Sequence, residues 1–155
     1  MRFSAEMSGA ADIRGYFERI KESVGDEDAL KRAAGLVKEG VLKRTASGID
    51  AAGRPFKPYT KTYKKRREKA GKQADTVDLE FTGRMLKDVV SKVSGAQIEI
   101  TFSTPESMVK ASGVEGLSNR RGGTKREFFA LSSNDKEAVA GIFSEHIDRV
   151  LASQG

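Results

Sequence analysis

Residues 53–62 read Gly-Arg-Pro-Phe-Lys-Pro-Tyr-Thr-Lys-Thr, and residues 79–86 read Leu-Glu-Phe-Thr-Gly-Arg-Met-Leu. The first stretch holds a glycine and two prolines, which are the residues that most often mark a change of chain direction. The second stretch places Thr82, a residue type that caps helices, directly before an apolar series. We therefore expect a turn, then a polar connection, then a helix from Thr82 to about Val93.

The polar connection carries the positive charge of the chain. Residues 54–72 hold nine Lys or Arg and one acid, Glu68, whereas the whole chain has a net charge of only +6. A local excess of this kind is typical of a surface that meets an anionic partner, although a solvated loop that aids solubility is the alternative interpretation. The candidate contacts to DNA or to a partner protein are Lys61, Lys64, Lys65, Arg66, Arg67 and Lys69, with Arg120, Arg121 and Lys125 in a second basic segment.

These two basic segments are predicted to be the flexible parts of one domain that spans residues 1–155. Residues 61–75 are highly polar, and a loop, a frayed helix and a disordered arm all fit their composition. Residues 112–126 are rich in glycine and basic residues, and long loops of this kind are usually functional or disordered.

Two helices are predicted before the turn. Apolar residues within 12–24 recur at helical spacing, and Gly25 follows them. A second helix is expected from Asp26 to about Lys43, because acidic residues at its start complement the positive end of the helix dipole. The two helices would form an N-terminal pair.

The rest of the chain mixes a strand with a helix. Gln97 to Phe102 alternates apolar and polar residues, which predicts a half-buried strand, and residues 106–112 are the candidate partner strand. Asn134 and Glu137 have the spacing of a capping box before an apolar stripe, which predicts a C-terminal helix. The expected class is therefore α+β: an N-terminal helix pair, a central helix, a small antiparallel sheet and a C-terminal helix.

The composition argues against several classes of function. The chain has no cysteine, which excludes disulfide scaffolds, cysteine nucleophiles and zinc sites built on thiolates. His146 is the only histidine and is expected at the edge of the core, and Asp78 with Glu80 lacks a third ligand for Mg²⁺. We expect no catalytic residue, no cofactor and no metal. No apolar run approaches the length of a membrane helix, so we expect no membrane partner and a cytoplasmic protein.

Three blocks of the sequence, in this order, resemble the phage virion-morphogenesis family, the Mu-like tail-completion proteins. Residues 53–62 are similar to its Gly-x-x-Trp-x-Pro-Leu turn, residues 79–85 to Leu-x-x-Thr-Gly-x-Leu, and residues 126–132 to Arg-x-Phe-Leu-Gly-Leu-Ser with an Asp downstream. The positions matched to the family motifs, some by substitution, are Gly53, Phe56, Pro58, Thr62, Leu79, Thr82, Gly83, Met85, Arg126, Phe128 and Leu131.

The chain also departs from the family pattern. Phe56 stands where tryptophan is usual, Tyr59 and Met85 replace leucine, and Ala130 replaces glycine. A His-x-x-Gly step often precedes the third block in the family, whereas residues 108–118 contain no histidine.

The resemblance covers residues 45–150 and implies a structural virion protein without enzymatic activity. Such a protein would form a homo-oligomeric ring at the neck or tail end, and would complete the tail or join it to the head. Its partners would be further copies of itself and other phage head, neck or tail proteins, with packaged DNA as a candidate contact. It would lie in the virion, and in the host cytoplasm during assembly. The alternative hypotheses are a small basic nucleic-acid-binding module and a Mg²⁺-dependent nuclease.

Overall fold

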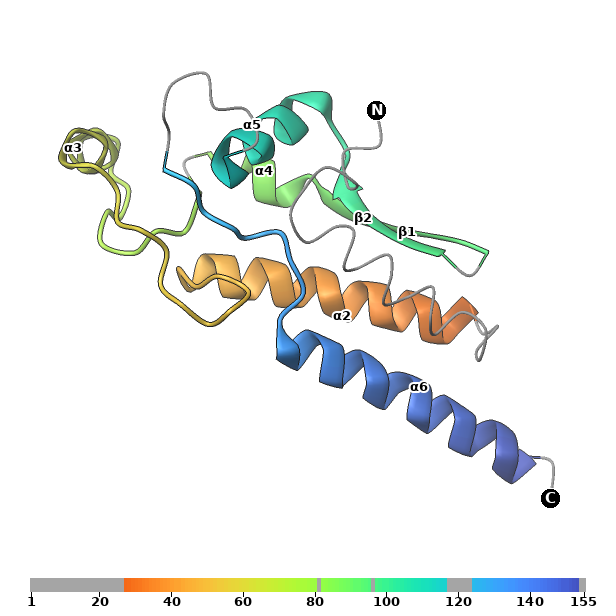
Figure 1. The fold of residues 1–155 in the computed structure, drawn as a ribbon. Helices are drawn as coiled ribbons and strands as arrows, with labels where there is room; N and C mark the ends of the chain where they lie inside the picture. The colour runs from red at the N-terminus through yellow and green to blue at the C-terminus, as the bar shows by residue number, and fades with distance from the viewer. Residues whose placement is uncertain (1–26, 81, 96, 117–123, 154–155) are drawn as a thin grey trace.

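The structure is a computed structural model of the 155-residue chain, and it describes residues 27–80, 82–95, 97–116 and 124–153. The helix predicted at residues 12–24 lies outside these ranges. The described part has an α+β fold, as predicted from the sequence. Its elements in chain order are α2 (Glu27–Ala46), α3 (Lys61–Lys69), α4 (Arg84–Lys87), β1 (Val89–Ser94), β2 (Gln97–Phe102), α5 (Pro105–Glu115) and α6 (Ser133–Ser153) (Figure 1).

Helix α2 runs through the middle of the fold and supplies much of its core. The β1–β2 ribbon lies on one side of α2, and α6 lies on the other (Figure 1). Ala33, Val37 and Val41 are spaced by four residues and are fully buried, so they form the apolar stripe that the sequence predicted for this helix. The predicted helix from Asp26 to about Lys43 is thus confirmed, with its end three residues later at Ala46.

The predicted helix from Thr82 to Val93 is wrong over most of its length. Only Arg84–Lys87 is helical, and the chain then enters β1, which pairs antiparallel with β2 from Val89 opposite Phe102 to Ser94 opposite Gln97. The valines of this stretch are β-branched and suit a pleated surface, and a complementary strand follows directly after Gly95. Residues 89–94 therefore pair with β2 and do not continue the helix. The predicted strand Gln97–Phe102 is confirmed.

The suggested strand at residues 106–112 is also wrong, because these residues belong to helix α5. Thr104 caps this helix by accepting a hydrogen bond from the Ser107 amide, and Pro105 occupies its first turn, where proline is well tolerated. The Asp88 carboxylate accepts hydrogen bonds of 2.6 Å from the hydroxyls of Thr104 and Ser107. These bonds fasten the start of α5 to the residue that follows α4.

The C-terminal helix is confirmed, but its capping box lies two residues earlier than predicted from Asn134. Ser132 Oγ accepts a hydrogen bond of 3.1 Å from the Asp135 amide, and Asp135 Oδ2 accepts one of 2.8 Å from the Ser132 amide. Asp135 also accepts a bond of 2.7 Å from Arg44 on α2, whose guanidinium donates in addition to the Ala130 carbonyl. The start of α6 is therefore tied to the end of α2.

Candidate functional site

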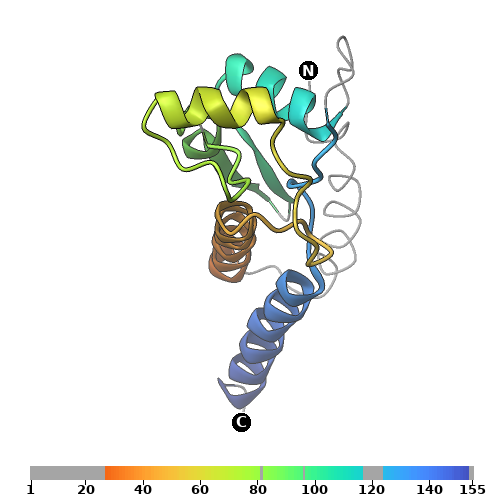
Figure 2. The same cartoon turned by 90° about the vertical axis from the view of Figure 1, so that its left-hand side faces the viewer.

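The basic stretch that follows the proline-rich turn folds as helix α3. Thr60 caps it by accepting a hydrogen bond of 3.3 Å from the Tyr63 amide. Of the three options left open for residues 61–75, a helix is therefore present over Lys61–Lys69. Helices α3 and α6 lie on opposite sides of α2 in both views (Figures 1 and 2). The main positive charge of the chain is thus displayed at the periphery of the fold.

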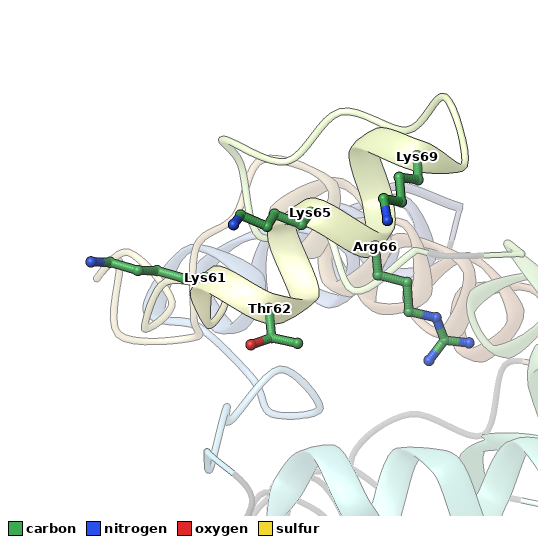
Figure 3. Close-up of a pocket in the computed structure, with 5 residues that line it drawn as sticks. All are labelled: Lys61, Thr62, Lys65, Arg66 and Lys69. Carbon is green, nitrogen blue, oxygen red and sulfur yellow. The ribbon is translucent and has the colours of Figure 1, made fainter.

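One face of α3 carries most of the predicted contact residues. Figure 3 shows Lys61, Thr62, Lys65, Arg66 and Lys69 around a shallow hollow, and all five are exposed. Four of these five side chains are cations and none is acidic. Lys64 is half-buried beside this group. We refer to Lys61, Thr62, Lys65, Arg66 and Lys69 as the basic face.

Arg67 points the other way, and the expectation that it contacts DNA or a partner is wrong. Only 1% of this residue is exposed. Its guanidinium is a planar donor with five N–H groups, and the fold supplies acceptors for it at short range. These acceptors are the Gln73 carbonyl (2.7 Å), the Glu80 carbonyl (2.9 Å), the two carboxylate oxygens of Asp78 (3.1 and 3.3 Å) and the Tyr59 hydroxyl (3.3 Å).

Tyr59 is the centre of this arrangement. The guanidinium carbons of Arg67 and Arg126 lie 4.8 and 5.4 Å from the centroid of its ring, which is cation–π distance. Its hydroxyl donates to Asp78 and accepts from the Leu79 amide at 3.1 Å. Burial raises the pKa of Tyr59 and lowers the pKa of Arg126. We call Tyr59, Arg67, Asp78 and Arg126 the tyrosine junction.

Arg126 brings the third sequence block to the first. Its Nε and one terminal nitrogen donate to the carbonyls of Lys57 and Pro58, at 3.0 and 3.1 Å. Since the Tyr59 hydroxyl also accepts a hydrogen bond from the Leu79 amide of the second block, all three blocks meet at one residue, Tyr59. Segments that are far apart in the sequence thus form one structural unit.

The other motif positions have mostly structural surroundings. Gly53 and Gly83 have φ angles of 79° and 77°, a backbone region that glycine enters without steric cost. Gly83, rather than Thr82, occupies the N-cap position of α4, and Thr82 is exposed. Leu79 holds a left-handed φ of 56°, which is uncommon for a residue with a side chain. Phe56, Met85, Phe128 and Leu131 are buried, whereas Pro58 and Thr62 are exposed.

The second basic segment is only partly described. Arg120 and Arg121 lie outside the described residues, and the start of the segment forms the last turns of α5. Lys125 is exposed and forms an ion pair of 2.5 Å with Glu127, which directly follows the segment. Gly113, Val114, Thr124 and Arg126 line a second hollow together with Arg66, so the described part of this segment reaches the edge of the basic face.

Glu115 is a buried carboxylate that the sequence analysis missed. It is 1% exposed, and its Oε1 accepts hydrogen bonds of 2.8 Å from the amides of Phe128 and Phe129. Burial raises its pKa, although these two amides favour the charged form. Glu115 thereby fixes the third block against the end of α5. Nothing in its local sequence distinguishes it from an exposed helical glutamate.

The described ranges contain no cluster of three or more His, Asp or Glu side chains suited to a metal ion. Asp78, considered as a magnesium ligand, is instead bound by Arg67 and by the Gln73 side chain at 2.6 Å. His146 is half-buried on α6. None of the helices in the described ranges is both long and apolar enough to span a bilayer.

The site as a whole is therefore a preformed basic helix that a buried polar junction holds against the fold. Its geometry suits contact with an anionic or protein surface, because the cations are exposed while the polar groups behind them are already paired. No family model, curated protein or solved structure matches this chain.

Proposed function

We propose that the protein is a structural component of a phage virion that forms a ring at the neck or tail end and completes the tail or joins it to the head. It acts by association, without a catalytic step or a cofactor. The observation that supports this role is the contact between the first and third blocks, in which the motif residue Arg126 donates hydrogen bonds to the carbonyls of Lys57 and Pro58.

The contacts within the junction support a shared structural purpose for the blocks. The first block supplies the ring of Tyr59, the second the Leu79 amide, and the third the guanidinium of Arg126. Each of these groups is engaged by another block at hydrogen-bond or cation–π distance. The blocks thus specify a scaffold, which is what an assembly subunit requires.

A ring subunit also needs two different surfaces that reach its neighbours, because a ring is built from heterologous contacts whose rotation closes. Two large apolar side chains are exposed in the described part: Val109 on α5 is 67% exposed, and Ile147 on α6 is 40% exposed. They lie on elements at different places in the fold (Figure 1). Contacts between copies through such separate surfaces are compatible with a head-to-tail ring.

The mass of the purified full-length protein tests the proposal. Light scattering is expected to give a defined multiple of 16.9 kDa, and electron micrographs are expected to show rings of uniform diameter. Ile147→Asp is expected to lower the assembled fraction, whereas Gln97→Asp, which adds the same single negative charge at an exposed site on β2, is expected to leave it intact. A chain that stays monomeric, together with normal joined particles from a phage that lacks the gene, would overturn the assembly role.

A further inference from the structure

The basic face of α3 is ordered despite features that oppose helix formation. Lys61, Lys65 and Lys69 follow one another at i, i+4 spacing, which places like charges side by side on the helix surface. Lys61 in the first turn also opposes the helix dipole, although Arg66, Arg67 and Lys69 in the last turn complement it. In addition, α3 has nine residues, fewer than the roughly 12–15 that an isolated helix needs in water.

Side chains on the opposite face supply the missing stability. Arg67 donates to four groups of the fold while almost fully buried, and Tyr63 packs edge-on against Tyr59 with ring centroids 5.0 Å apart. The helix is therefore held from behind, and its cations keep a fixed spacing at the surface. Buried contacts that hold mutually repelling lysines in a fixed arrangement are expected where these lysines bind another molecule.

The chemistry of the basic face favours phosphate over an acidic protein. Protein interfaces are depleted in lysine and are centred on apolar or aromatic anchors. The face offers three lysines, Arg66 and the small Thr62, with no large apolar side chain among them. Lysine binds phosphate as a point charge, so this set matches a nucleic-acid backbone.

The same set favours duplex over single-stranded nucleic acid. Binding of single strands depends on exposed aromatic rings on which bases stack. Tyr59 is buried, and Tyr63 is half-buried against it.

We propose that the basic face of α3 binds the phosphate backbone of double-stranded DNA without reading its sequence. Lys61 and Lys69 are eight residues apart, which is about 12 Å along a helix. Duplex DNA carries one charge per roughly 1.7 Å of its axis, so a face of this length spans several phosphates. The binding does not depend on the ring proposed above, because the isolated protein carries the whole face.

Fluorescence anisotropy with a labelled 30-base-pair duplex, over a series of salt concentrations, tests this binding. Four phosphate contacts predict a slope of about −3.6 for log K against log salt concentration, since each contact contributes about −0.9. Lys65→Gln with Lys69→Gln is expected to reduce the slope to about −1.8 and to weaken binding roughly 60-fold at 0.1 M salt. Lys43→Gln with Lys92→Gln removes the same charge from exposed sites elsewhere and is expected to change neither value.

Three outcomes would overturn the proposal. The first is an absence of duplex binding at 20 mM salt, and the second is an equal loss in both double variants, which would make the effect one of net charge alone. The third is a preference for polyglutamate or for a single strand of the same charge over the duplex. Circular dichroism of both variants, and equal masses by light scattering, exclude unfolding or altered assembly as the cause of any difference.

Discussion

The region around α2 and the region around α3 are held together by different kinds of interaction. Around α2, side chains such as Val37, Val139 and Phe129 are buried with almost no exposed surface. Around α3, the central buried side chain is the cation Arg67, which is surrounded by a carboxylate, a phenol and two carbonyls. The first region depends on apolar area, and the second depends on the geometry of hydrogen bonds.

This difference separates global stability from the placement of the basic face. Apolar burial is non-directional and adds up over many contacts, so the α2 region is expected to set the free energy of unfolding. A buried polar network is strong only while all its members are paired, so the tyrosine junction is expected to set where α3 sits. We therefore expect α3 to open independently of the core, as a separate unit of low local stability.

Phe129→Ala is expected to have the largest effect on stability, because it removes an aromatic ring from the apolar region. Phe129 is 1% exposed, and its ring centroid lies 5.3 Å from that of Phe102 and 6.0 Å from that of Phe128. Truncations of this kind cost about 3–5 kcal/mol, and urea unfolding should show the loss in a single transition. Glu39→Ala, at an exposed site on α2, should stay within about 0.5 kcal/mol. A similar cost at both sites would contradict a core centred on α2.

Arg67→Ala is the next largest change and tests the separation of the two regions. It leaves Asp78 and two backbone carbonyls without their buried donor, at a cost of about 3 kcal/mol. Hydrogen exchange should show lost protection over residues 60–72, with the protection of α2 and α6 retained. Arg66→Ala, on the exposed face of the same helix, should leave the exchange pattern unchanged. Loss of protection throughout the fold would show that the regions unfold together.

Two glycines of α2 give a third test, with effects of opposite sign. A Cβ at Gly40 would overlap Asp135 Oδ1, whereas a Cβ at Gly35 would meet nothing within 4 Å. Gly40→Ala should therefore displace Asp135 from Arg44. The net destabilisation, once the gain in helix propensity is subtracted from the cost of the overlap, should be about 1–2 kcal/mol. Gly35→Ala should stabilise the protein by about 0.5–1 kcal/mol. Thermal unfolding of the two variants measures both changes in stability. If Gly40→Ala were more stable than the parent protein, α6 would lie farther from α2 than in the structure.

The apolar region was more predictable from sequence than the tyrosine junction. The spacing of apolar residues in α2 and the alternation in β2 report directly which face is buried. Val89, Val90 and Val93 misled the prediction because a short apolar run fits a helix as well as a strand, and the ladder with β2 decides between them. Arg67 resembles its basic neighbours in the sequence. Its burial depends on Tyr59 and Asp78, whose positions only the fold provides.

Glu115 offers the smallest and most selective test, because it is a single carboxylate inside the apolar region. Burial raises its pKa above the usual 4.5, so the folded protein holds this proton more tightly than the unfolded chain does. The stability that the group contributes is therefore fully present below pH 4.5 and is lost as the pH rises through its folded pKa. Asp50 and Asp88, whose pKa values are lowered, act in the opposite sense and lose their contribution as the pH falls.

Glu115→Gln separates this contribution from that of the other acids. The amide oxygen can still accept from Phe128 and Phe129, but the side chain no longer ionises. The variant should match the parent protein near pH 4 and exceed its unfolding free energy by less than about 1 kcal/mol at pH 7, as urea titrations at both pH values would measure. Glu115→Ala removes the acceptor as well, so it should destabilise at both pH values by about 1–3 kcal/mol. If Glu115→Gln were less stable than the parent at pH 7, the two amide hydrogen bonds would outweigh desolvation, and the charged form would be the one that the apolar region favours.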